Sequence, residues 1–301
     1  MFLRQLTYLI ALDQYRHFSR AAEHCNVSQP ALSMAIRQLE HELGVPIVRR
    51  NRRVLGLTPE GERVLAWARQ TMAALEGLRQ EADFAHEVAG GTLSIGTIPP
   101  AIQIMPLLME SLRAAVPALH IELTVSANTD ILHDLTEQRL QMGLIYLDQV
   151  PEDGSFETHQ LYAEQYVFVA GSRMELPSRK TFSWADAAEH PLGLLGHSMR
   201  TRQIVDECFA KAGAKPNVLL ETNALELLYV ELLAGRLATI LPVAALPDQR
   251  DPANPLQIRR LASCPAPGVG LVRLKQPVQT ALMSRSWEVA TQLVLEDALT
   301  V

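Results

Sequence analysis

Positions 18–44 of the chain read FSRAAEHCNVSQPALSMAIRQLEHELG, and this stretch decides the fold of the N-terminal region. Apolar residues recur every three or four positions from Leu32 to Leu39, which predicts a helix with one buried face. Ser28 is a suitable N-cap for this helix, and Pro30 is tolerated in its first turn. Gly44 is a suitable C-terminal stop. The stretch therefore predicts one well-delimited helix.

Two shorter helices are predicted before it. Apolar residues at Leu3, Leu6 and Leu9 share one face of a helix that ends near Tyr15, and Ser19 is a candidate cap for a second helix. Two short helices joined by a tight turn form a helix-turn-helix, whose second helix can enter the major groove of DNA. An ordinary helical hairpin has the same spacing, so spacing alone leaves both interpretations open.

The polar residues of the second helix of this motif favour a DNA-binding helix-turn-helix over an ordinary helical hairpin. Gln29, Ser33 and Arg37 are spaced by four and lie on one face, away from the apolar face. Glutamine can pair with adenine, and arginine with guanine, through two hydrogen bonds each. The predicted DNA-contacting residues of this helix are Ser28, Gln29, Pro30, Ser33 and Arg37.

A cluster of arginines follows the helix. Arg49, Arg50, Arg52 and Arg53 lie within five positions, and Val54–Leu57 can close a small hairpin or wing. Guanidinium groups suit phosphate contacts, which position a protein on DNA without reading its sequence. A solvated basic surface is the alternative. We expect these four arginines to contact the DNA backbone.

The distribution of charge agrees with a DNA-binding N-terminus. The net charge of the chain is −6, but residues 1–66 hold nine arginines, no lysine and six acidic residues, which gives +3. Residues 67–301 hold 18 basic and 27 acidic residues, which gives −9. A basic module thus precedes an acidic body.

The stretch from Ala11 to Arg50, continued by Leu57–Gly61, resembles the DNA-binding domain of LysR-type transcriptional regulators. Cys25 stands where the family usually has leucine, and Ile47-Val48 where a Leu-Phe pair is common, so an apolar side chain is kept at these positions. The resemblance implies a winged helix-turn-helix that binds DNA as a dimer. It rests on the motifs Phe18-Ser19-Arg20-Ala21-Ala22, Val27-Ser28-Gln29-Pro30-Ala31-Leu32-Ser33, Ile36-Arg37-Gln38-Leu39-Glu40, Leu43-Gly44-Val45-Pro46 and Leu57-Thr58-Pro59-Glu60-Gly61.

A long connecting helix is predicted after the wing. Thr58 is a cap followed by a first-turn proline at Pro59, and the helical pattern continues to Gly90-Gly91. Its apolar residues could form a seam between two helices or could pack on the same domain. The family resemblance implies that this helix pairs two DNA-binding domains, which predicts a homodimer or homotetramer. The apolar residues are Leu65, Ala68, Met72, Leu75, Leu78 and Ala82.

The rest of the chain alternates predicted strands and helices, from a strand at Leu93–Thr97 to a helix at Arg285–Leu299. This alternation predicts an α/β body with mostly parallel sheets. The body resembles LysR-type effector domains, which have a bilobed periplasmic-binding-protein-like fold. The expected domains are a winged helix-turn-helix at 1–58, a linker helix at 59–90 and an effector-binding domain at 91–301, with lobe I at 91–162 and 268–301 and lobe II at 163–267.

A small-molecule effector is expected between the lobes. In open α/β sheets, ligands bind beyond the carboxyl ends of strands, where helix N-termini favour anions. Arg200 is the only obvious cation on these loops, which favours an anionic metabolite. Some of the candidate positions also have a purely structural interpretation. Asn223 with Glu226 fits a capping box at the start of a helix, so Thr222 and Asn223 could serve helix capping alone. His197 could be a surface histidine, and Tyr146 could be a core residue. The candidate effector residues are Thr97, Ile98, Pro99, Pro100, Ser126, Asn128, Tyr146, His197, Ser198, Arg200 and Thr222.

Catalytic, metal and cofactor sites are not expected. Gly196–Arg200 begins like a nucleophile elbow but has arginine where glycine is required. The sequence has no GxxxxGK, HExxH or CxxC motif. Peroxide-sensing LysR-type members form a disulfide from a cysteine at the place of Cys208 and one about ten residues earlier, where this chain has Ser198. We therefore expect no such thiol switch, and expect Cys208 to be a buried apolar residue.

The functional expectation is a DNA-binding transcriptional regulator controlled by a small effector. Its expected partners are double-stranded operator DNA, the effector, a second copy of the chain and RNA polymerase. The alternative is a metabolite-binding protein that shares only the bilobed fold. The nearly apolar run Leu237–Leu246 has about half the ~20 residues of a membrane span, and no signal peptide is recognised. The cytoplasm is the expected compartment.

Overall fold

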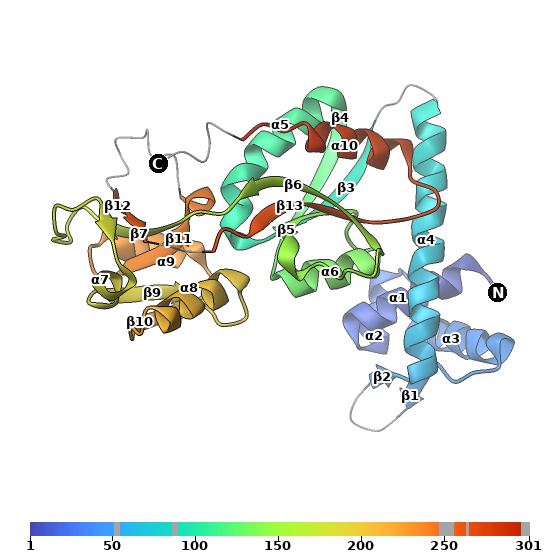
Figure 1. Cartoon of the computed structure of the whole chain (residues 1–301). Coiled ribbons are helices and arrows are strands. Elements are labelled where there is room, and N and C mark those ends of the chain that lie inside the picture. Colours follow the sequence, from blue (N-terminus) through green and yellow to red (C-terminus); the bar gives the residue numbers. More distant parts are fainter. Residues whose placement is uncertain (51–54, 86–89, 247–255, 263–264, 296–301) are drawn as a thin grey trace. The chain divides into compact units, whose positions relative to one another are not determined.

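The computed structural model describes residues 1–50, 55–85, 90–246, 256–262 and 265–295 (Figure 1). The chain divides into two compact units, Met1–His86 and Glu87–Val301. Each unit has its own buried cores, so each is described by itself.

The first unit is the predicted winged helix-turn-helix. Leu32, Ile36 and Leu39 are fully buried in its core. Ser28 caps α3, accepting a hydrogen bond from the Ala31 N–H at 3.4 Å, and Gly44 ends it in the left-handed conformation. Its elements are α1 (Leu3–Tyr15), α2 (Phe18–His24), α3 (Gln29–Leu43), the antiparallel hairpin of β1 (Val48–Arg50) and β2 (Leu55–Leu57), and α4 (Pro59–Ala85).

One predicted boundary in this unit is wrong. The N-cap of α2 is His17 rather than Ser19, because the helix already begins at Phe18, whose ring packs on the core. Helix α4 covers Pro59–Ala85 and Gly90 begins β3. The residues between them lie outside the described part of the chain, so the predicted stop at Gly90-Gly91 stays a prediction. The start of α4 is as predicted, because the Thr58 hydroxyl accepts a hydrogen bond from the Gly61 N–H at 2.9 Å.

Helix α4 packs on its own domain through its N-terminal half. Leu65 and Ala68 are buried in the same core as α1 and α3, and Met72 packs against that core. Arg69 forms a buried ion pair with Asp13 of α1 at 2.6 Å. The predicted intermolecular seam is therefore wrong for Leu65 and Ala68, which are buried within one chain.

The second unit contains two sheets. The lobe I sheet has the order β4-β3-β5-β13-β6, with α5 and α10 on one face and α6 on the other (Figure 1). Gly96 and Gly143 let Ile131 of α6 approach this sheet. The elements are β3 (Gly90–Thr97), β4 (Ala118–Val125), β5 (Met142–Tyr146), β6 (Phe156–Ala163), β13 (Gly268–Leu274), α5 (Met105–Ala115), α6 (Asn128–Thr136), α10 (Ala281–Thr291) and the 3-10 turns η1 (Pro99–Ile104) and η2 (Leu147–Gln149).

The lobe II sheet has the order β10-β9-β11-β7-β12-β8. Alternate residues of its strands enter two cores: Phe168 packs with α7 and α8, and Val169 packs with α9. The elements are β7 (Tyr166–Gly171), β8 (Thr181–Phe182), β9 (Pro191–Leu195), β10 (Asn217–Thr222), β11 (Ala238–Pro242), β12 (Leu256–Leu261), α7 (Trp184–Ala188), α8 (Arg200–Lys211), α9 (Leu225–Leu233) and η3 (Val243–Ala245).

Both sheets are mixed: five pairs of described strands are parallel and four are antiparallel, so antiparallel pairing is more frequent than predicted. Strand β13 runs antiparallel to β5 and β6, and β7 runs antiparallel to β11 and β12. Pairing across the two chain crossings produces this arrangement, and it cannot be inferred from local alternation of strands and helices. Helix α10 is also displaced, covering Ala281–Thr291 instead of Arg285–Leu299, because Thr280 caps it.

Candidate functional site

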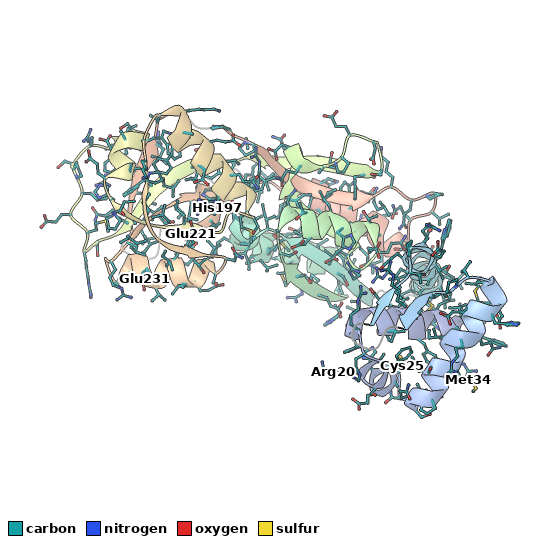
Figure 2. All side chains as sticks on the ribbon, turned by 90° about the horizontal axis from the view of Figure 1, so that it is seen from below. Arg20, Cys25, Met34, His197, Glu221 and Glu231 are labelled. Atoms are coloured by element: carbon teal, nitrogen blue, oxygen red, sulfur yellow. The ribbon has the colours of Figure 1, made fainter. Side chains whose placement is uncertain are left out.

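Helix α3 presents a polar surface opposite its buried face. The side chains of Gln29, Pro30 and Arg37 are exposed, and Arg37 donates a hydrogen bond to the Ser33 hydroxyl at 3.2 Å. Met34 lies on the same outer surface and is 67% exposed (Figure 2). Met34 was not among the predicted DNA contacts, although an apolar residue on a polar helix face was a usable signal.

The wing is attached directly to this helix. The Glu40 carboxylate of α3 accepts hydrogen bonds from the backbone N–H groups of Ile47 and Val48, at 2.9 and 3.0 Å. Arg49 of β1 is exposed. Of the other predicted phosphate contacts, Arg50 belongs to β1, while its side chain and the residues Arg52 and Arg53 lie outside the described part of the chain.

Four predicted effector residues meet at the carboxyl ends of the lobe I strands. The Asn128 side chain makes two hydrogen bonds with the backbone of Tyr146, at 2.9 and 3.1 Å. The Ser126 N–H donates to the carbonyl of Thr97 at 3.1 Å. Thr97, Asn128 and Tyr146 are buried. Asn128 therefore fixes the end of β5 rather than pointing a free amide at a ligand.

The Tyr146 hydroxyl connects the two lobes. It lies 2.9 Å from the Thr201 hydroxyl of α8 and 3.2 Å from the Tyr166 hydroxyl of β7. Burial and the nearby Glu164 carboxyl raise the pKa of Tyr146 well above its usual range. Tyr146 thus remains a neutral phenol at the lobe junction, part of the core and in contact with both lobes.

Arg200 does not have the predicted environment. It is the first residue of α8, 20% exposed, and its guanidinium lies 2.8 Å from the Asp148 carboxylate and 3.1 Å from the Glu207 carboxylate. Partial burial lowers the pKa of Arg200, but the hydrogen bonds to Asp148 and Glu207 outweigh it and raise the pKa. The inference of an anionic effector rested on an uncompensated cation, and these ion pairs remove that basis.

Arg200 is also not the only cation at this edge. Arg202 is buried, and it lies 2.9 Å from both Asp206 and Glu221. His197 is exposed and lies 3.2 Å from Asp206 and 3.3 Å from Glu221 (Figure 2). Arg202 is therefore paired with acidic side chains, and the exposed His197 fits the alternative interpretation as a surface histidine.

The remaining predicted effector residues divide between covered and exposed positions. Ile98, Pro99 and Pro100 are buried at the start of η1, and Ser198 is exposed in the turn before α8. The Thr222 hydroxyl accepts a hydrogen bond from the Ala224 N–H at 3.1 Å. The N-cap of α9 is Ala224, so the predicted capping box of Asn223 with Glu226 is wrong.

One titratable residue at the lobe junction was missed. Glu164, between β6 and β7, is 1% exposed, and neither of its carboxyl oxygens has a hydrogen-bond partner within the described residues. Burial raises the pKa of Glu164 to about 8, and the nearby Tyr146 hydroxyl offsets part of the rise without reaching hydrogen-bond geometry. A single glutamate between two strand-like segments gives no sequence signal of burial.

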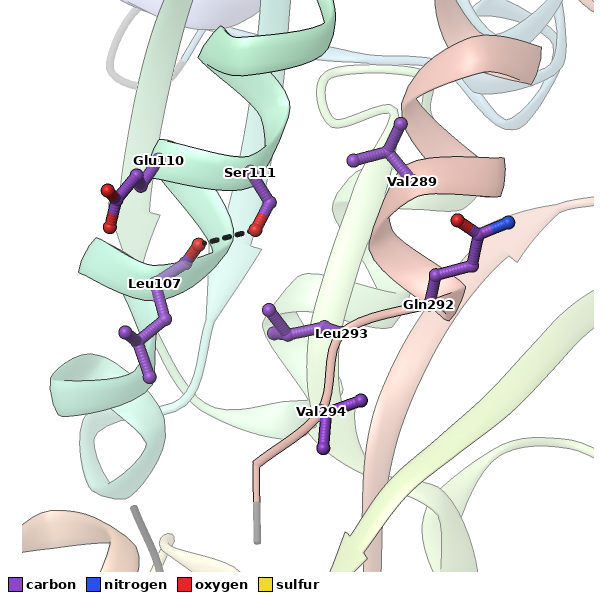
Figure 3. Close-up of a pocket in the computed structure, with 7 residues that line it drawn as sticks. All are labelled: Leu107, Glu110, Ser111, Val289, Gln292, Leu293 and Val294. Atoms are coloured by element: carbon purple, nitrogen blue, oxygen red, sulfur yellow. Dashed lines mark hydrogen bonds between the residues drawn. The ribbon is translucent and has the colours of Figure 1, made fainter. Parts of the chain in front are cut away.

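A surface groove lies elsewhere in lobe I. It has a volume of about 450 Å³ and runs between α5 and α10 (Figure 3). No predicted effector residue lines it; its lining residues are Leu107, Glu110, Ser111, Val289, Gln292, Leu293 and Val294.

Cys208 is buried in the core between α8 and the lobe II sheet, as predicted. Cys264 lies outside the described residues. The described part of the chain contains no group of three or more histidine, cysteine, aspartate or glutamate side chains that could hold a metal ion. Nor does any helix in that part have the length and apolar character needed to cross a membrane.

Two protein-family descriptions match the chain. Residues 3–62 match the bacterial regulatory helix-turn-helix protein of the lysR family, and residues 86–294 match the LysR substrate binding domain. Because the helix-turn-helix match accompanies the substrate-binding match, the regulatory interpretation is favoured over a metabolite-binding protein without a regulatory role.

Similar proteins agree with this assignment. The chain is 32% identical to the hydrogen peroxide-inducible genes activator of Haemophilus influenzae, over 82% of this chain and 81% of the relative. It is also 32% identical to the DNA-binding transcriptional dual regulator OxyR of Escherichia coli K12, over 90% and 89%. The structure of a full-length OxyR variant from Pseudomonas aeruginosa has a TM-score of 0.68 at 24% identity, covering 97% and 93%. These relatives are regulators and not enzymes, and the chain belongs to the LysR family of bacterial transcriptional regulators.

Proposed function

We propose that the chain regulates transcription by reading an operator through α3 and by responding to a small effector that binds between the two lobes. The observation that carries the proposal is the outer face of α3, where Gln29 and Arg37 are exposed on a helix capped by Ser28. The proposed base-contacting residues also include Pro30, Ser33 and Met34. Arg49, Arg50, Arg52 and Arg53 would contact phosphates.

The proposed division of the chain is a DNA-binding domain at 1–58, a linker helix from 59 and an effector-binding domain to 301. We assign lobe I to 91–162 and 268–301, and lobe II to 163–267. The strands of the two sheets support this division, because they come from 90–163 with 268–274 and from 166–261 respectively.

The proposed assembly is a homodimer that pairs the linker helices, with a tetramer as its doubled form. Support comes from a stripe on α4 that its own domain leaves exposed at heptad-like spacing: Trp67, Thr71, Ala74 and Leu78. Trp67 and Leu78 are each 69% exposed. A two-fold dimer would recognise an imperfect palindrome, and a regulator bound at a promoter would contact RNA polymerase.

The proposed effector site uses the lobe junction around Thr97, Ser126, Tyr146 and Thr201. Support comes from Tyr146, which contacts both lobes and is therefore sensitive to their arrangement. Ile98, Pro99 and Pro100 would form apolar walls, with Asn128, His197, Ser198 and Thr222 at the edges. A ligand would shift the lobe arrangement only if it binds one arrangement more tightly than the other.

The test begins with selection of bound duplexes from a random pool, which yields an operator sequence directly. Arg37→Ala should weaken binding to this operator by about 1 to 3 kcal/mol and relax preference at one base pair. Arg49→Ala, and likewise Arg52→Ala, should weaken the operator and a scrambled duplex alike and reduce the salt slope by about one. Equal losses on both duplexes for Arg37→Ala would exclude base reading by that residue.

A further inference from the structure

The Glu164 side chain is buried at the crossing between the lobes. Its residue follows β6 and precedes β7, and its N–H donates a hydrogen bond to the carbonyl of Pro267 at 2.9 Å. Pro267 immediately precedes β13, on the segment that returns to lobe I. Glu164 therefore lies where the two connecting segments run side by side.

The groups that face this carboxyl are acidic. Tyr146 at the end of β5 and Tyr162 of β6 both interact with Glu164, and Tyr166 of β7 interacts with both tyrosines. The Tyr162 hydroxyl, like the two Glu164 oxygens, has no hydrogen-bond partner in the described part of the chain. A buried carboxylate without a paired cation is costly, so the cluster favours a protonated carboxyl.

The burial of Glu164 determines how pH would affect the arrangement of the lobes. With the lobes as described, burial raises the pKa of Glu164 to about 8, against an ordinary value of 4.5. Separation of the lobes would admit water and return the group toward its ordinary value. The closed arrangement therefore holds the proton more tightly. Proton binding by Glu164 therefore stabilises the closed arrangement relative to the open one. This stabilisation of the closed arrangement is complete below about pH 4.5 and is lost as the pH rises through about 8.

We propose that Glu164 is a proton-binding site that couples pH to the arrangement of the lobes. Closure would form one O–H bond between a Glu164 oxygen and a proton from solvent, and opening would return that proton to water. The contacts closed at the same time would include Tyr146 with Thr201 and Arg200 with Asp148. The proposal deepens the proposed function and rests on it, because the lobe arrangement matters for regulation only if it affects DNA binding.

The experiment measures amide hydrogen exchange of the full chain without effector or DNA. After correction for intrinsic exchange, the protection factor of the Glu164 amide should fall close to tenfold per pH unit between about 5.5 and 7.5. Glu164→Gln keeps the shape but has no titrating proton, so its protection should be independent of pH. Glu189→Gln removes an exposed carboxyl after α7 and should behave as wild type.

A pH-independent protection factor in the wild type would overturn the proposal, and so would the same slope in Glu164→Gln. If Glu164→Gln does not fold, infrared spectra of the wild type at different pH values replace the comparison with this variant. Loss of a protonated-carboxyl band near pH 8 would support the proposal. Loss of such a band only near pH 4.5 would overturn the proposal. The pH slope is measured without effector, so it does not depend on the proposed effector control. If the slope is found but no tested effector changes DNA binding, the proton site is retained and the proposed effector control is refuted.

Discussion

At the scale of single residues, Met34 offers the sharpest test of DNA reading. Its side chain is 67% exposed on the polar face of α3, where a thymine methyl group is the natural apolar contact in a major groove. Met34→Ala should weaken operator binding by about 1 kcal/mol, because it removes only part of the apolar area of a methionine. The measurement is fluorescence anisotropy on the operator and on the same duplex with uracil in place of thymine.

Uracil lacks only the methyl group, so wild type should lose affinity on the uracil duplex and Met34→Ala should not. His41→Ala changes an exposed residue in the last turn of the same helix and serves as the matched control. It should show the wild-type penalty for uracil. An equal penalty in wild type and Met34→Ala would show that Met34 does not contact a thymine methyl group.

Cys208 provides a second prediction at this scale. Its side chain is 3% exposed in the lobe II core, and position 198, ten residues earlier, is serine. We expect hydrogen peroxide to leave DNA affinity unchanged and to form no disulfide at Cys208, because a buried thiol is poorly accessible to oxidants. Gel shifts with and without peroxide, with thiol mapping by mass spectrometry, check this. A peroxide response that Cys208→Ala abolishes would contradict it.

Residues differ in how far sequence could predict their roles. Ser28, Gly44 and Thr58 act locally, so a cap or a stop within one turn of chain was sufficient to assign them. Glu164 and Arg200 obtain their surroundings from residues far along the chain, such as Pro267 and Asp148. Sequence spacing alone therefore could not predict the burial of Glu164 or the ion pairs of Arg200.

At the scale of elements, α4 has two distinct surfaces. Met72 faces the core of its own domain, whereas Leu78 lies on the exposed stripe. Leu78→Glu should shift a dimer toward monomers without lowering the stability of the domain, because it places a charge only in the proposed interface. Met72→Glu should instead reduce domain stability by roughly 2 kcal/mol. Light scattering at micromolar concentration and thermal unfolding separate the two effects.

The control for this prediction is Ala66→Glu, which adds the same charge to an exposed position of α4 that is not three or four residues from any member of the stripe. It should leave the oligomeric state and the stability close to wild type. Dissociation by all three substitutions alike would indicate general charge repulsion rather than a specific seam. An unchanged oligomer with Leu78→Glu would place the interface elsewhere.

The same helix shows what periodicity can establish. The three-and-four spacing correctly predicted a long amphipathic helix from Thr58, but it could not say whether Leu65 and Ala68 face a partner or their own domain. Tertiary packing on α1 decides this, reinforced by the Asp13–Arg69 ion pair. The place of β12 beside β7 likewise depends on pairing across about ninety residues, which local periodicity does not reveal.

At the scale of the whole effector domain, the mixed sheets follow from the two crossings between the lobes. Strands β3, β4 and β5 are parallel neighbours as local alternation predicts, whereas β13 joins them antiparallel after the chain returns from lobe II. This return brings Pro267 beside Glu164. The bilobed architecture was thus accessible from sequence through family resemblance, but the chemistry at the junction was not.

The ion pair of Arg200 with Asp148 yields a prediction for the arrangement of the lobes. Arg200 begins α8 in lobe II and Asp148 belongs to η2 in lobe I, so their 2.8 Å contact joins the lobes. Arg200→Gln and Asp148→Asn should each favour opening, measured as a larger distance between fluorophores placed on the two lobes. The double variant should open little further than either single variant, because each already breaks the same contact.

The pair also distinguishes a structural from a ligand-binding role for Arg200. If Arg200 binds an anionic effector, Asp148→Asn should strengthen sulfate binding because it removes a competing carboxylate, while Arg200→Gln should abolish it. If Arg200 only joins the lobes, both variants should leave sulfate binding negligible in calorimetry while both increase opening. We expect the second result, since the carboxylates of Asp148 and Glu207 already neutralise the guanidinium in the closed arrangement. A strong sulfate response in Asp148→Asn alone would restore the anion hypothesis.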